Sequence, residues 1–177
     1  MRPTRRRQRL TRFTLLLAAS WCVMTVVHES GHILCGWACG GTLREADVAP
    51  WHLPHSSFDP DPLPLVTVWG GPGLGALLPL AAAALLRRNW LWFVAYFCLL
   101  ANGCYLATAW VSGERHLDTP RLFQHGALPV TVVVYCLVTL GVGYVGFRRE
   151  CIRVLSPVAP APGRGMLAES THAAPID

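Results

Sequence analysis

Four long runs of the chain are almost free of charged residues, and they restrict the fold more than any other feature. They are 13–27, 65–86, 90–111 and 127–147. Three of them approach or exceed the roughly 20 residues that a helix needs to cross about 30 Å of hydrocarbon. Of all residues, 53% are hydrophobic and 14% are charged, a balance typical of membrane proteins. We therefore expect an all-α, polytopic membrane protein with about four transmembrane helices.

The first run is too short to span a membrane unless its helix continues to about Cys39. That continuation requires His28, Glu29 and His32 to lie at membrane depth. A cleaved signal peptide is the alternative, because arginines precede the apolar segment. Apolar residues continue past Ser20 without a clear small-x-small cleavage site, which favours a retained signal-anchor helix.

The arginines indicate the orientation of the helices. The chain has no lysine, and six of its 15 arginines fall within 1–12. The positive-inside rule places that end in the cytoplasm. Four spans then place 87–88 and 148–149, which are both Arg-Arg, inside as well. The segments 40–64 and 112–126 lie outside and carry three arginines against six acidic residues.

The same reasoning divides the chain into three parts. We expect a basic cytoplasmic N-terminus at 1–12, a transmembrane domain at 13–147 and a largely disordered cytoplasmic tail at 148–177. We attribute the net charge of +5 to the arginines at the cytoplasmic ends of the helices. A nucleic-acid site would need a basic face with stacking aromatic residues, and the sequence does not indicate one. We expect a multi-pass protein of the cell membrane, a bacterial plasma membrane in particular, whose immediate partner is the lipid bilayer.

The polar residues of the first span form an H-E-x-x-H motif, with His28 and His32 four residues apart. This spacing places both imidazoles on one helix face, where they can bind one Zn²⁺, while Glu29 can accept a proton from water. A chance match and a polar cluster that joins helices are the alternatives. An ionisable side chain at the centre of a span costs about 2.5–3.5 kcal/mol on insertion scales. We therefore expect a metal site.

Other residues in the spans have simpler explanations. Gly71 and Gly75 form a small-residue stripe that favours close helix packing, and local unwinding of 70–73 to present backbone groups to a substrate is a compatible alternative. Asn102 is expected to form a helix–helix hydrogen bond.

Cysteines and the remaining histidines are weaker candidates. Cys35 and Cys39 are one turn apart and are expected to be small buried residues, with metal ligation or a disulfide as alternatives. His52 and His55 flank a proline without a fixed helical face, so we expect an interfacial loop with Trp51 near the lipid headgroups.

Three stretches, "HESGH", "GWACGG" and "GGPGLGALLP", give the chain a resemblance to a known family. Over roughly 13–126 it resembles a minimal member of the site-2 protease family of intramembrane zinc metalloproteases. The resemblance implies that His28 and His32 are zinc ligands, that Glu29 is the general base and that a later aspartate completes the site. Asp118 is the best match for that aspartate.

The segment around Asp118 departs from the family pattern. Thr119 stands where the family usually has glycine, and the customary Asn-x-x-Pro sequence does not precede Asp118. An aspartate before an early proline is also a helix-start signature, so a helix cap is the alternative role. Glu114 and His116 are reserve ligands.

The expected function is hydrolysis of a peptide bond in or near a transmembrane segment of a substrate protein. The alternative is a metal-binding membrane scaffold or a pseudoprotease that binds partner helices without cleaving them. A partner subunit or a homo-oligomer is open as the source of substrate recognition, because no separate recognition domain is visible in the 177 residues.

Overall fold

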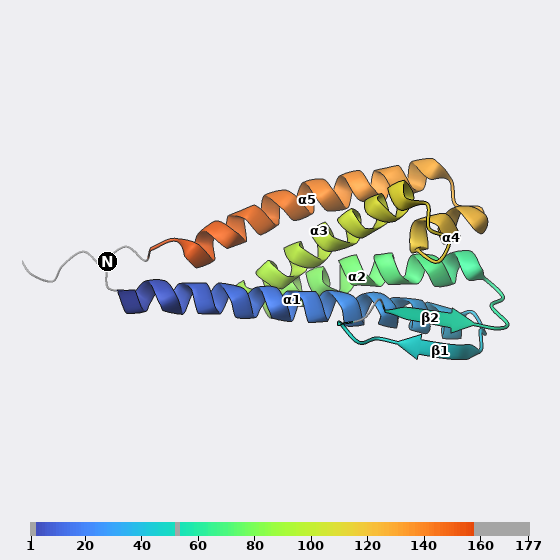
Figure 1. Cartoon of the computed structure of the whole chain (residues 1–177), viewed down its shortest axis with the longest axis horizontal. Helices are drawn as coiled ribbons and strands as arrows, with labels where there is room; N and C mark the ends of the chain where they lie inside the picture. The colour runs from blue at the N-terminus through green and yellow to red at the C-terminus, as the bar shows by residue number, and fades with distance from the viewer. Residues whose placement is uncertain (1–2, 52–53, 158–177) are drawn as a thin grey trace, which may run out of the picture.

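The computed structural model describes residues 3–51 and 54–157 of the chain. Four long helices form a bundle, and a two-stranded hairpin and one short helix lie at one end of it (Figure 1). In chain order the elements are α1 (Pro3–Ala38), β1 (Leu43–Asp47), β2 (His55–Phe58), α2 (Pro64–Leu86), α3 (Asn89–Ser112), α4 (Asp118–Gln124) and α5 (Pro129–Leu155).

All four long helices are long and apolar enough to cross a membrane, which confirms the expected all-α polytopic fold. Two of the long helices extend past the boundaries expected for the transmembrane domain. Helix α1 begins at Pro3, so most of the basic N-terminus is helical, and α5 continues through Leu155 rather than ending near residue 147. Both extensions keep backbone groups hydrogen-bonded beyond the apolar segment. The rest of the expected tail, 158–177, lies outside the described residues.

Helix ends follow local sequence signals. Pro64 and Pro129 begin α2 and α5, where their lack of an N–H group costs no helical hydrogen bond. Helix α3 ends at Ser112, and the next residue, Gly113, has a φ of 66° and donates its N–H to the carbonyl of Ala109. Glycine suits this left-handed conformation because it has no Cβ atom. The chain can therefore turn directly from α3 into the loop before α4.

The interior of the bundle is small, and its outer faces are apolar. The fully buried core includes Val68, Leu106, Leu122 and Val132, so α2, α3, α4 and α5 each contribute to it. Many large apolar side chains point outwards, Val111 being 89% exposed. A soluble protein would rarely expose so much apolar surface, and lipid covers such faces in a membrane protein.

Helices α1 and α2 approach so closely that glycines are required between them. A Cβ atom on Gly31 would lie 2.2 Å from the carbonyl oxygen of Gly70, and one on Gly70 would lie 2.4 Å from that of Gly31. One on Gly71 would lie 2.2 Å from Nε2 of His32. Since α2 is helical throughout 70–73, these contacts support the packing role of the glycines rather than local unwinding.

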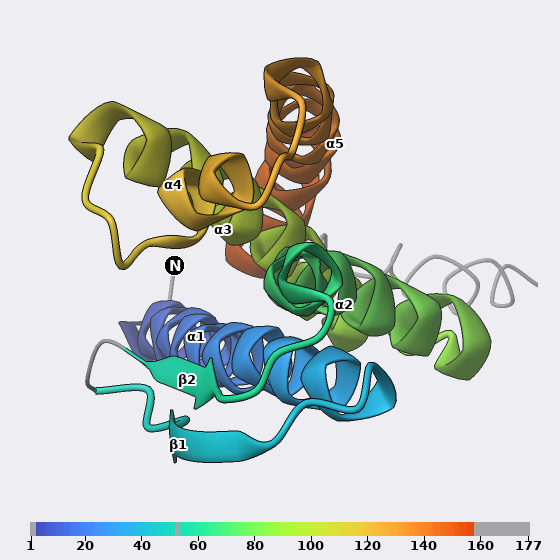
Figure 2. The ribbon, with the colours of Figure 1, turned by 90° about the vertical axis from the view of Figure 1, so that its right-hand side faces the viewer.

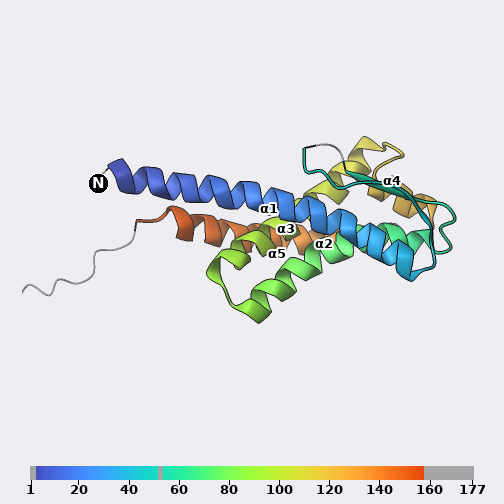
Figure 3. The same cartoon turned by 90° about the horizontal axis from the view of Figure 1, so that it is seen from below.

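The segment after α1 contains two unexpected strands on either side of the expected interfacial loop, of which 52–53 lie outside the described residues. It turns back along α1 as an antiparallel hairpin, in which Ala46 lies opposite Ser56 (Figures 1 and 3). Beyond β1, the indole Nε1 of Trp21 donates a hydrogen bond to the carbonyl of Pro50 over 2.8 Å. Trp21 lies 17 residues, or about 25 Å of helix rise, before the end of α1. Strand pairing satisfies backbone groups that a loop beside a transmembrane helix would leave unpaired.

The hairpin, α4 and the loop before α4 all lie at the end of the bundle where α1 terminates (Figures 1 and 3). The α2–α3 turn and the start of α1 lie towards the opposite end. This arrangement agrees with the expectation that the chain crosses the membrane four times, with both connections 40–64 and 112–126 on the same side. That the hairpin end is the external one stays a prediction from the arginine distribution.

The glycine contacts generate a stability prediction. We expect Gly70→Ala to lower the free energy of unfolding by about 1–3 kcal/mol, because the added methyl group overpacks the α1–α2 contact. Gly73→Ala is the matched control, since a Cβ atom there has no neighbour within 4 Å and alanine favours the helix by up to about 1 kcal/mol. Thermal unfolding in detergent measures both, and equal melting temperatures would contradict the contact.

Candidate metal centre

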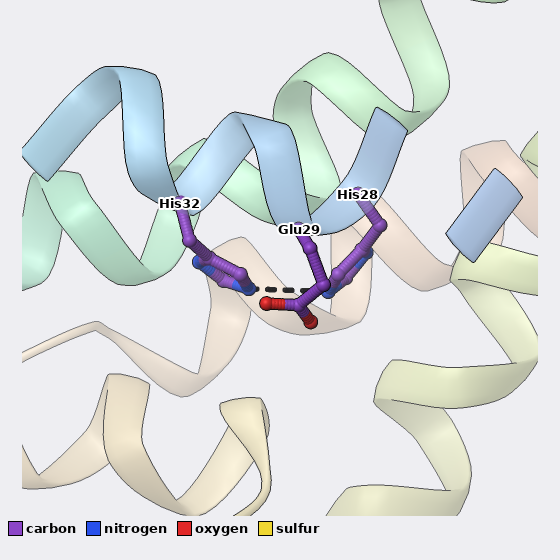
Figure 4. Close-up of side chains that lie close together, drawn as sticks. All are labelled: His28, Glu29 and His32. Carbon is purple, nitrogen blue, oxygen red and sulfur yellow. Dashed lines mark hydrogen bonds between the residues drawn. The ribbon is translucent and has the colours of Figure 1, made fainter. Parts of the chain in front are cut away.

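His28 and His32 point from one face of α1 towards the same position (Figure 4). Their Nε2 atoms are 3.2 Å apart, and their ring centroids are separated by 4.9 Å. Glu29 lies beside them, with ligand atoms of all three residues within 4.8 Å of one another. All three side chains are buried. The one-turn spacing of the motif therefore gives the clustering expected from helical geometry.

Asp118 joins the two histidines from the other side of the bundle. Its Oδ2 lies 2.9 Å from Nε2 of His28 and 3.2 Å from Nε2 of His32. Asp118 is the first residue of α4, and only 3% of it is exposed. The Thr119 hydroxyl holds this position by donating to the carbonyl of Leu106 over 2.7 Å. The carboxylate contacts the histidines, as a third ligand should.

The reserve ligands lie elsewhere. Glu114 and His116 are exposed in the loop before α4, and His55 lies 3.5 Å from Glu45 on the hairpin. His52 is outside the described residues. Asp118 is therefore the best-placed third ligand among the described candidates.

Hydrogen bonds at the outer ring nitrogens fix which atoms the histidines present. Asn102 donates its Nδ2 to the carbonyl of Cys98 over 2.8 Å, so its Oδ1 accepts from Nδ1 of His28 over 2.7 Å. Nδ1 of His32 lies 2.9 Å from the carbonyl oxygen of Thr67, to which it must donate. A neutral imidazole carries one proton. Both Nε2 atoms therefore present lone pairs to Asp118.

Three electron-rich atoms thus meet at one buried point, and only a cation or added protons can stabilise them there. Their separations are 2.9, 3.2 and 3.2 Å. A tetrahedral zinc with bonds of about 2.0–2.1 Å has ligand atoms about 3.3–3.4 Å apart. Oxygen and imidazole donors, each ring held by an outer hydrogen bond, also suit zinc. The donor set therefore fits a metal ion.

Without a metal, protons on the histidines can stabilise the same cluster of atoms. Burial by itself raises the pKa of Asp118, but the charge of His32 and hydrogen bonds from both histidines lower it further, so the pKa lies below its ordinary value. The carboxylate is therefore ionised at neutral pH, the form in which it binds cations.

Glu29 lies close to both histidines but has a different hydrogen-bond partner. Its Oε2 accepts a hydrogen bond from the hydroxyl of Ser56 over 3.3 Å, and Glu29 is 4% exposed. Ser56 belongs to β2, so the hairpin that turns back along α1 reaches the motif. The Glu29 carboxylate is thereby held beside the three candidate metal ligands, His28, His32 and Asp118, without being one of them.

Sequence reasoning missed three supporting contacts. Asn102 was expected to join helices, which it does, but its partner is His28. A buried amide in an apolar span signals some polar partner without naming it. The carbonyl of Thr67 gives no signal, because every residue has one. Ser56 gave none either, since β1 and β2 are short, polar strands.

A cavity of about 720 Å³ leads from Glu29 and His32 to the surface. Strand β2 lies on one side of it, and α4 with its preceding loop lies on the other (Figure 2). Its lining includes His55, Ser57, Tyr105, Arg121 and His125. The cavity is large enough for several waters and an extended peptide segment.

No protein-family model matches the chain, and no curated protein or solved structure is significantly similar to it. The resemblance to site-2 proteases therefore rests on the sequence motifs, and membership of that family stays a prediction.

Proposed function

We propose that the chain is an intramembrane zinc metalloprotease that hydrolyses a peptide bond in or near a transmembrane segment of another membrane protein. The observation that supports it best is the convergence of His28, His32 and Asp118 beside a buried Glu29, at the inner end of a cavity. Three protein ligands with a general base alongside are typical of catalytic rather than structural zinc sites.

Each residue then has one task. His28, His32 and Asp118 would hold zinc, which supplies a lowered pKa for water and polarisation of the scissile carbonyl. Glu29 accepts the proton of the attacking water and delivers it to the amide nitrogen as the C–N bond breaks. Ser56 orients the Glu29 carboxylate through its hydroxyl.

The surroundings of the site restrict the substrate. His28 lies ten residues, or about 15 Å of helix rise, before the end of α1 at Ala38. A substrate segment at that depth starts as a helix, whose carbonyls are already hydrogen-bonded, so it must unwind before cleavage. The cavity between β2 and α4 offers polar groups to the unwound backbone.

The alternative, a metal-binding scaffold, needs the same ligands but no base. A buried carboxylate is costly unless it has a partner or a task. Glu29 lines the cavity and has its own hydrogen-bond donor, which favours the hydrolase. Recognition by a partner subunit or a second copy of the chain stays a prediction.

The role of Glu29 generates the first functional prediction. Glu29→Gln should keep zinc and fold but lower the cleavage rate by at least about 10²–10⁴-fold, because the amide cannot accept the proton. Cleavage of a transmembrane reporter peptide by full-length protein in proteoliposomes measures the rate. An unchanged rate would contradict the mechanism, whereas a scaffold would bind its partner equally well with either residue.

The ligand assignment generates a second prediction, measured as zinc affinity of purified protein. Asn102→Ala should weaken zinc binding by about 10–100-fold, the usual effect of losing a partner behind a ligand. Asp118→Ala should weaken it further, because a ligand itself is lost. Glu114→Ala and His116→Ala are controls and should bind zinc normally. If either control loses zinc while Asp118→Ala keeps it, the assignment of Asp118 is wrong.

A further inference from the structure

Arg121 is a half-buried cation in the wall of the cavity. It lies three residues after Asp118 on α4, a spacing that places two side chains on the same helix face. The Asp118 carboxylate contacts His28 and His32, and Arg121 lines the cavity on the same face of α4. His125, one further turn along, also lines the cavity.

The acidic residues near Arg121 are engaged elsewhere or exposed. Asp118 contacts both histidines, and Glu29 accepts from Ser56. Within 3–51 and 54–157, Arg121 forms no ion pair. By contrast, Arg44 at the same end of the bundle lies 3.8 Å from Asp59. Glu114 also lines the cavity but is exposed, and it forms no ion pair with Arg121 within the described residues. A half-buried guanidinium in a cavity wall without an ion-pair partner is suited to bind an anion from outside the chain.

We propose that Arg121 binds a carboxylate of the substrate, an inference that rests on the proposed protease function. The planar guanidinium can donate two parallel hydrogen bonds to a carboxylate. Because Arg121 shares its cavity with Glu29 and His32, a carboxylate bound there belongs to the chain being cleaved. The substrate class is a transmembrane polypeptide with an acidic group on the hairpin side of the scissile bond.

Two sources can supply this carboxylate, an Asp or Glu side chain or the C-terminal carboxylate of a shortened chain. Four synthetic peptides with one apolar transmembrane segment distinguish them. The first has Glu in the flank at the hairpin end, and the second has Gln there. The third has the Gln flank with a free C-terminal carboxylate close to the segment, and the fourth has the same flank with a C-terminal amide.

The test measures binding of these peptides to zinc-loaded, full-length Glu29→Gln protein in nanodiscs of zwitterionic lipid. We expect about tenfold tighter binding of one carboxylate peptide than of its neutral partner, as for a hydrogen bond to a charged group. Adding Arg121→Gln should remove this difference, and Arg121→Glu should instead favour a fifth peptide that has Lys in the flank at the hairpin end. Arg44→Gln removes a charge away from the cavity and should leave the preference unchanged.

Equal binding of carboxylate and neutral peptides would overturn the inference, as would a preference that survives in Arg121→Gln with normal zinc content. A preference that depends on anionic lipid rather than on the peptide would overturn it too, by assigning Arg121 to the membrane surface. The protease function is tested separately by cleavage with Glu29 intact. If no peptide is cleaved while the Arg121-dependent preference remains, the proposed function fails and the carboxylate site stands.

Discussion

The structure depends on the meeting of three lone-pair atoms inside an apolar bundle. Nε2 of His28, Nε2 of His32 and Oδ2 of Asp118 lie within 3.2 Å of one another. Without a cation between them, these atoms repel each other and lose the hydration that they have in water. Substituting any one of these three residues should therefore disturb its contacts with both of the others.

Helix packing around this point supports the same geometry. The ring of His32 lies where a side chain on Gly71 would be, and the amide of Asn102 lies against Gly75. The glycines of α2 thus let α1 and α3 bring polar groups together across a narrow gap. The hairpin adds Ser56 from the opposite side of the motif. The close packing of α2 therefore also positions the site residues, and a shift of α2 would displace both His32 and Asn102.

Much of this arrangement could be predicted from particular residues. The uncharged runs predicted the four long helices, and the four-residue spacing predicted that His28 and His32 share a face. The proximity of Asp118 was anticipated from the resemblance to site-2 proteases, in which a later aspartate completes the zinc site, although a helix cap was an open alternative. The hairpin was not predictable, because "LREAD" and "HSSF" are short and lack apolar alternation. Nor were the partners of Asn102 and of the Thr67 carbonyl, since both depend on the way separate helices pack.

We expect a metal ion to occupy the point where the His28, His32 and Asp118 ligand atoms meet. X-ray absorption at the zinc edge, on purified full-length protein in nanodiscs, tests it most directly. The proposed metal site requires about one zinc per chain with two imidazole ligands and oxygen ligands at about 2.0–2.2 Å. It would be contradicted by a lack of stoichiometric zinc, or by sulfur ligands at about 2.3 Å, which would move the metal to cysteines such as Cys35 and Cys39.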